Sequence, residues 1–345
     1  MSGRGPGGRS GIICAGSWCV DVNNIIDRWP DEETVAKILS ASRQGGCPGH
    51  NMTTALRRLG ATFPVEGVGL IGDDEEGRLL ASICDELRID RRRLVMRSDL
   101  RTSVTYAMIA KRTGKRTFFY SAGAHAVQTP DMIDFADSGA RIAHVGLPGI
   151  HDIIDAPWRG DANGWVTILK KARAAGLRTN IELVSVDPPR IRELTEPMLP
   201  HLSMMIVNDL EAGAVAGLTT VRDGVTDIPA CRQAAAALLA RSEMELVAVH
   251  FPRGGIVATR DGTLLERPSV NVPPAEVKSS NGAGDCFAAG ILFGVHEGWP
   301  FDRALQLAHA AAAASLRAES TTGAVVPWQE CLALADRWGW REGWT

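Results

Sequence analysis

The chain has 345 residues, 45% of them hydrophobic and 22% charged, with a formal net charge of -3. This composition is typical of a folded globular protein and excludes a disordered or fibrous chain, and the length predicts one large α/β unit with an appendage, or two domains. No excess of positive charge would attract nucleic acid, and no apolar run approaches the roughly 20 residues that span a bilayer. We therefore expect neither nucleic acid nor a membrane as a partner.

The first ten residues predict a flexible tail, because they lack the apolar stretch of a signal peptide and are rich in glycine. The seven cysteines are odd in number, scattered and mostly set in apolar segments, which suits reduced thiols. No spacing of Cys and His ligands indicates zinc. Together these features favour a cytoplasmic protein.

From residue 11 onward, short apolar runs alternate with helical patterns. The runs predict strands near residues 11–20, 64–69, 141–147, 177–183, 203–207 and 246–251. The helical patterns lie near residues 52–59, 75–87, 166–175, 189–199, 231–241 and 284–298. Because parallel neighbours need crossover connections, this alternation predicts a three-layer, doubly wound, mostly parallel sheet over residues 11–345.

A second unit is expected where the alternation breaks. Residues 102–110 and 116–121 predict a hairpin around the glycine of Arg112-Thr113-Gly114-Lys115. With a segment near residues 20–44 it forms a small β-sheet lid, inserted from about 20–44 and 101–122, although residues 32–39 look more helical than extended. The basic residues of the turn, Lys111, Arg112, Lys115 and Arg116, are explained by solvation alone, without an anionic partner.

The most informative motif is Gly282-Ala283-Gly284-Asp285, where small residues lead into a long apolar helix. The glycines allow a ligand to approach the backbone, and the first amides of the helix point outward at the positive end of its dipole. This predicts an anion hole with Asp285 beside it, able to accept a proton from an attacking hydroxyl. Taken alone, a capped helix start explains the motif equally well.

Gly45 and Gly46 form a second glycine site, followed by Asn51 at the expected entrance of a helix. The Asn51 amide could bind sugar hydroxyls through both its donor and its acceptor. Alternatively, Asn51 only caps the helix.

Asn208 and Glu211 lie one helical turn apart after a buried strand. Their oxygens could hold the water shell of Mg²⁺. A capping box has the same spacing and explains the pair without metal.

These sites, in this order, resemble the ribokinase-like family of carbohydrate and nucleoside kinases, also called the PfkB family. The resemblance extends from about Ile12 to Pro327. It rests on Gly45-Gly46 with Asn51, on residues 69–77 (GLIGDDEEG), on Asn208 with Glu211, and on residues 282–285 (GAGD).

The resemblance implies transfer of the terminal phosphoryl group of ATP to a hydroxyl of a small sugar or polyol. Asp285 is then the base, and the amides of Gly282, Ala283 and Gly284 join that of Asp285 in the anion hole. Substrate contacts are implied for Asp21, Gly46 and Asn51, nucleotide contacts for Asn208, Gly255 and His309, and Mg²⁺ contacts through water for Asn208 and Glu211. His309 is also explained as an ordinary histidine on a helix face. Family members often pair through the lid, so a homodimer is expected.

Three departures from the family pattern bear on substrate and cofactors. Ser279-Ser280 stands where Asp-Thr is common, so the resemblance does not extend to activation by a monovalent cation. His250-Phe251-Pro252 replaces a turn near the nucleotide. No glutamate follows the strand at 141–147, which argues against ribose itself.

The sequence therefore predicts an ATP-dependent sugar kinase. Two alternatives stay open. One is a nucleoside kinase of the same family, to which Phe118, Phe119 and Tyr120 would offer aromatic stacking partners. The other is a catalytically silent sugar- or nucleotide-binding protein that keeps the fold.

Overall fold

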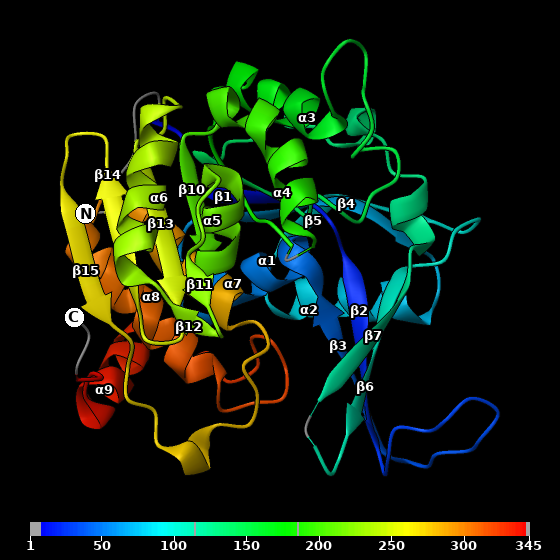
Figure 1. Ribbon diagram of the computed structural model, residues 1–345. Coiled ribbons are helices and arrows are strands. Elements are labelled where there is room, and N and C mark those ends of the chain that lie inside the picture. Colours follow the sequence, from blue (N-terminus) through cyan, green and yellow to red (C-terminus); the bar gives the residue numbers. More distant parts are fainter. Residues whose placement is uncertain (1–7, 114, 185, 343–345) are drawn as a thin grey trace.

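The computed structural model describes residues 8–113, 115–184 and 186–342. Its main feature is a nine-stranded sheet, most of it parallel (Figure 1). The strand order is β15 (Leu264–Pro268), β14 (Gly254–Thr259), β13 (Leu246–Phe251), β10 (Met204–Asn208), β9 (Arg178–Ile181), β8 (Ile142–Gly146), β1 (Ile12–Gly16), β4 (Val65–Gly72) and β5 (Asp90–Arg97). Only the pairings of β14 with β13 and β15 are antiparallel in this sheet.

Helices cover both faces of this sheet, as the alternating pattern predicted. One apolar core contains residues of α1 (Cys47–Arg58), α2 (Glu75–Glu86), α7 (Ala283–Glu297), α8 (Phe301–Ser315) and α9 (Trp328–Trp338). The core on the opposite face contains residues of α3 (Gly164–Ala174), α4 (Pro188–Thr195), α5 (Asp209–Ala216) and α6 (Ile228–Ala240). Strand β1 contributes alternately to the two, with Ile12 in the first and Ile13 in the second. The three-layer prediction is therefore confirmed.

A separate four-stranded sheet projects from this core (Figure 1). Its strand order is β3 (Ile38–Gly46), β2 (Cys19–Ile26), β6 (Ser103–Ala110) and β7 (Arg116–Ser121). The expected helical character of residues 32–39 is wrong: a turn at Glu32 and Glu33 leads into β3, which pairs antiparallel with β2. Sheet pairing outweighs the weak local helical preference of this segment. Gly114, expected in the hairpin turn, lies outside the described residues.

The predicted single strand over residues 11–20 is in fact two strands in two sheets. Strand β1 ends at Gly16, and the chain leaves the core through Ser17 and Trp18 before β2 begins at Cys19. The indole Nε1 of Trp18 donates to the Val68 carbonyl at 3.0 Å. A Cβ atom at Gly69 would lie 2.4 Å from Trp18 Cδ1, so only glycine leaves room for the buried ring.

Three strands of the main sheet, β5, β14 and β15, were not predicted. Strands β5 and β15 are edge strands with mixed burial and charged residues, so they lack the continuous apolar run of a central strand.

The described part of the N-terminal segment contacts the core. Arg9 Nε donates to the Ala140 carbonyl at 2.7 Å, while residues 1–7 of the expected tail lie outside the described residues. Among the described residues, no helix is long and apolar enough to cross a bilayer.

Candidate functional site

A cavity of about 650 Å³ lies between the small sheet and the carboxyl ends of β8, β9 and β10, and we name it the acceptor cavity. Such positions at the carboxyl ends of parallel strands are the usual ligand sites of open α/β sheets. Its lining brings together seven of the predicted site residues, from segments that are far apart in the sequence: Asp21, Asn51, Asn208, Glu211, Gly282, Gly284 and Asp285.

Asp285 lies in the first turn of α7 and is held by Asn51. Asn51 Nδ2 donates to Asp285 Oδ2 at 2.9 Å, and the hydroxyl of Thr321 donates to Asn51 Oδ1 at 2.9 Å. Helix α1 begins at Cys47 with Gly46 as its N-cap residue, so the interpretation of Asn51 as a helix cap is wrong. Asn51 instead fixes the orientation of the carboxyl group.

Glu182 and His144 complete this part of the site and were missed by the sequence analysis. Glu182 follows β9 directly and lines the acceptor cavity. Asn180 Nδ2 donates to His144 Nδ1 at 2.9 Å, which leaves the imidazole proton on Nε2, facing Glu182 Oε2 at 3.0 Å. A glutamate does therefore stand beside the site, but it comes from β9 and not from the segment after β8.

The two carboxyl groups of Glu182 and Asp285 perturb each other. Burial, followed by the negative charge of Glu182, raises the pKa of Asp285 well above its ordinary value. Burial also raises the pKa of Glu182 to about 7. Two adjacent, part-buried carboxylates cannot both be charged at low cost, so one of them keeps a proton near neutral pH.

Asp21 lies on the opposite wall, on strand β2. Burial raises its pKa to about 6, and the Cys19 thiol donates to Asp21 Oδ1 at 3.6 Å. A Cβ atom at Gly46 would lie 2.5 Å from Asp21 Oδ2, so this glycine leaves room for the carboxyl group. Gly46 therefore affects the site by leaving room for the Asp21 carboxyl group.

The start of α7 has the conformation that its glycines predict. Gly282 has φ of +78°, and a Cβ atom there would lie 2.5 Å from the Thr321 carbonyl oxygen. The Ala283 amide donates to the Ser280 carbonyl at 3.3 Å. Among the described residues, the amides of Gly282, Gly284 and Asp285 have no hydrogen-bond partner, so these three are open donors at this helix terminus and the Ala283 amide is not.

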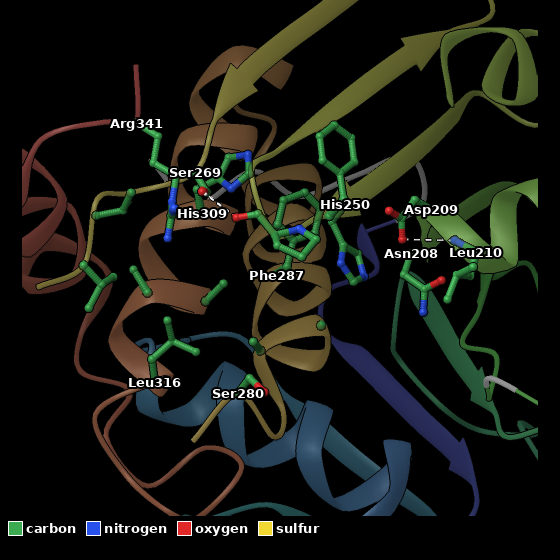
Figure 2. A pocket seen from close by; sticks show the side chains of 18 residues that line it. Asn208, Asp209, Leu210, His250, Ser269, Ser280, Phe287, His309, Leu316 and Arg341 are labelled. Carbon is green, nitrogen blue, oxygen red and sulfur yellow. Dashed lines mark hydrogen bonds between the residues drawn. The ribbon is translucent and has the colours of Figure 1, made fainter. Parts of the chain in front are cut away.

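A second cavity of about 410 Å³ lies on the other side of the α7 terminus, and we name it the nucleotide cavity (Figure 2). The rings of His250, Phe287 and His309 face it, and the centroids of His250 and Phe287 are 5.0 Å apart. Burial lowers the pKa of His250 to about 4 and that of His309 to about 3, so both are neutral at pH 7. Gly255 does not line this cavity; it lies behind it, where its Cβ would be 3.1 Å from His309 Nε2.

The two cavities meet at four residues that line both, namely Asn208, His250, Ser280 and Gly284. A ligand in one cavity can therefore reach a ligand in the other past the amide of Gly284. Asp285 lines only the acceptor side.

Asn208 and Glu211 form the capping box of α5. Asn208 Oδ1 accepts from the Glu211 amide at 2.8 Å, and Glu211 Oε2 accepts from the Asn208 amide at 3.1 Å. An oxygen that accepts one hydrogen bond keeps a second lone pair, so capping and water-mediated contact with a cation are compatible. Among the described residues, no group of three or more His, Cys, Asp or Glu side chains is arranged to hold a metal directly.

Comparison with known proteins agrees with this architecture. The chain is 28% identical over 335 residues to a 5-dehydro-2-deoxygluconokinase of Shouchella clausii, covering 94% of this chain and 95% of the relative. It is 22% identical over 301 residues to a ketohexokinase of Mus musculus, covering 86% and 92%. These relatives are named as sugar kinases.

Solved structures share the fold. A Methanocaldococcus jannaschii nucleoside kinase has a TM-score of 0.77 at 18% identity, covering 96% of this chain and 100% of its own. An Arabidopsis thaliana ribokinase, solved with ribose and ATP, has a TM-score of 0.76 at 20% identity, covering 95% and 98%. The family model described as pfkB family carbohydrate kinase matches residues 10–329. The fold and the GAGD helix start between two cavities agree with that match, and the chain belongs to the pfkB family of carbohydrate kinases.

Proposed function

We propose that the protein transfers the terminal phosphoryl group of ATP to a hydroxyl of a small sugar or polyol. The observation that carries this proposal is the place of Asp285: its part-buried carboxyl group lines the acceptor cavity, next to the open amides of the α7 terminus and the junction with the nucleotide cavity. Phosphoryl transfer depends mainly on alignment and charge stabilisation, and this arrangement supplies both.

In the reaction, the acceptor hydroxyl gives its proton to the Asp285 carboxylate while its oxygen attacks the γ-phosphorus. The new O–P bond forms as the bond to the bridging oxygen of ATP breaks, and ADP leaves with that electron pair. The open amides of Gly284 and Asp285 stabilise the phosphoryl oxygens, as helix termini do for anions. Asn51 keeps the carboxyl group aimed at the hydroxyl.

Glu182 sets the protonation of the base. The charge of Glu182 raises the pKa of Asp285 well above its ordinary value, so the shared proton lies mainly on Asp285, which acts as the base once that proton has left. His144, which donates to Glu182, stabilises the ionised form of that carboxyl group.

Mg²⁺ would neutralise phosphate charge when bound. Asn208 and Glu211 would hold it through water, because carboxylate and amide oxygens suit its hydration shell. Glu211 is only 6% exposed and lines the acceptor cavity, which supports this role.

We infer an uncharged acceptor. The acceptor cavity is lined by four carboxyl groups, those of Asp21, Glu182, Glu211 and Asp285, and no lysine or arginine lines it among the residues that the structure describes. His250, which also lines it, is neutral at pH 7. Carboxylates accept hydrogen bonds from hydroxyl groups and repel a sugar phosphate, so a neutral polyol fits best.

A nucleoside is the second candidate acceptor, and one observation favours it. Phe118 of β7 lines the acceptor cavity and offers a face on which a base can stack. A nucleoside also meets the requirement for an uncharged acceptor.

The small sheet would act as a lid over the acceptor and exclude water. Its outer face carries Tyr106 and Phe119, opposite each other across β6 and β7 and 41% and 51% exposed. Exposed aromatic residues of this kind suit a homodimer formed through the lid. The seven free cysteines agree with the cytoplasmic location expected from the sequence.

The test is an ADP-release assay with purified protein, ATP and Mg²⁺ against a panel of acceptors. We expect turnover with at least one neutral sugar or nucleoside, and lower kcat/KM for the matched sugar phosphate. The absence of turnover with every acceptor, while the protein still binds ATP, would favour the silent binding protein.

A further inference from the structure

A third cavity, of about 480 Å³, adjoins the other two and belongs to neither. It lies between the end of the small sheet and residues 277–281, which lead into α7, and we name it the lid-tip cavity. It shares Asn23, Ser280 and Asn281 with the acceptor cavity and Ser280 with the nucleotide cavity. Ser280 therefore borders all three.

Strand register shows how the small sheet reaches from one cavity to the next. Asp21 pairs with Thr105 close to the acceptor, and four residues further along β2, Ile25 pairs with Ile109. Ile109 pairs in turn with Arg116 on β7. Since side chains two residues apart lie on the same face of a strand, Arg116 is on the face of the sheet that bears Asp21. It lines the lid-tip cavity.

Two exposed cations line this cavity. Arg116 belongs to the small sheet and Lys278 to the segment that leads into α7, and both line the cavity. In the part of the chain that the structure describes, neither side chain has an ion-pair or hydrogen-bond partner. Arg43, on the same sheet, is by contrast paired with Glu75 at 2.5 Å. The one carboxylate in the lining is Glu319, so the cations outnumber it.

The path of the nucleotide explains why cations are needed here. Resting on the function proposed above, a nucleotide whose base occupies the nucleotide cavity brings its phosphates to the four residues that this cavity shares with the acceptor cavity, and Ser280 is one of them. A phosphate chain beside Ser280 lies at the border of the lid-tip cavity. The acceptor cavity, described above, offers it four carboxyl groups and no cation among the described residues. The lid-tip cavity supplies the missing positive charge.

We propose that Arg116 and Lys278 bind the phosphate chain of ATP in the lid-tip cavity, and that this contact draws the small sheet onto the core. In the sequence, solvation alone explains the basic residues of the hairpin turn. The present proposal gives one of them, Arg116, a function. Arginine and lysine both bind phosphate strongly, arginine through its planar fork and lysine as a point charge. Because one comes from the lid and the other from the core, a bound polyphosphate would favour the closed position of the lid.

The test compares R116A and K278A with a matched control, R112A, in the full-length protein. Arg112 is exposed in the same turn and does not line the cavity. Binding of ADP and of inorganic tripolyphosphate is measured by titration calorimetry, and KM for ATP and for the acceptor by steady-state kinetics. Each cavity variant should weaken tripolyphosphate binding and raise KM for ATP about tenfold, the loss expected for one hydrogen bond to a charged group. R112A should match the wild type, and R116K should recover part of the loss.

The outcomes separate this inference from the proposed function. If the wild type phosphorylates an acceptor but the cavity variants keep its affinity for tripolyphosphate and ATP, the inference is wrong. If only KM for the acceptor rises, the cavity serves the acceptor and the inference is again wrong. If no acceptor is phosphorylated by any variant, yet tripolyphosphate binding depends on both cations, the kinase proposal fails and the anion site stands.

Discussion

Replacing Glu182 with glutamine tests the electrostatic coupling inside the acceptor cavity. The amide keeps the size of the side chain and can still accept from His144 Nε2, but it carries no charge. The pKa of Asp285 should therefore fall, because the second cause of its elevation is removed while burial stays. A base acts in its ionised form, so activity rises with pH through this pKa. A lower pKa moves the acidic limb of the kcat/KM profile to lower pH.

The size of this shift of the acidic limb follows from the charge interaction between Glu182 and Asp285. Two unit charges about 4 Å apart interact by about 4 kcal/mol at an effective dielectric constant of about 20. At about 1.4 kcal/mol per pKa unit, this sets an upper bound of about three units. Glu182 has a pKa of about 7 and is therefore only partly charged near neutral pH. We expect a displacement of about one to two pH units.

The assay measures kcat/KM for the best acceptor between about pH 5 and pH 9, a range that brackets the Glu182 pKa of about 7. E193Q is the control, since Glu193 is exposed on α4 and pairs with Arg190, away from the cavity. The melting temperature of each variant at pH 7 reports on folding. An E182Q profile that coincides with the wild-type profile, in a variant that is folded, would refute the coupling of Glu182 to the base.

Three further predictions concern single positions. D285N should lower kcat by about 10²- to 10⁴-fold, the range for removal of a general base, while calorimetry finds ATP affinity retained; a loss of ATP binding alone would contradict this. G46A places a methyl group against Asp21, so KM for the acceptor should rise about tenfold with KM for ATP unchanged, as initial-rate kinetics can measure. F119S removes an aromatic residue whose ring stacks on Trp29 at 6.2 Å, and sedimentation should find a higher proportion of monomer if the lid forms the dimer; an unchanged distribution would place any dimer contact elsewhere.

The central strands of the main sheet and most of the helices that cover it were predictable, because their signals are local. Central parallel strands are buried on both faces and therefore read as continuous apolar runs, and the glycines before α7 mark a helix that starts beside a ligand site. The place of Asp285 in the first turn of that helix follows from the same local pattern. The sequence also predicted that Asn208 and Glu211 share one helix face, because the spacing alone decides it.

The small sheet was less predictable, because its shape depends on pairing between distant segments. Residues 32–39 favour helix locally, but in the fold they form a turn and a loop that lead into β3, whose first two residues are Ile38 and Leu39 and whose partner is β2. The break at Trp18 between β1 and β2 depends on three glycines, Gly49, Gly67 and Gly69, that leave space for one ring.

The amino-acid sequence by itself determined the fold class, through the alternation of apolar runs and helical patterns, and it determined the start of α7 and the identity of the acidic residue at the GAGD motif, because these two depend on neighbours within about one helical turn. Only the tertiary structure decided what surrounds that residue. Asn51, Glu182 and Asp285 come from three separate elements, and burial and mutual repulsion perturb the two acids only after the chain has folded around them. The pKa of a carboxyl group depends on the charges and the solvent within a few ångströms of it, and no local pattern in the sequence specifies which distant side chains will be there.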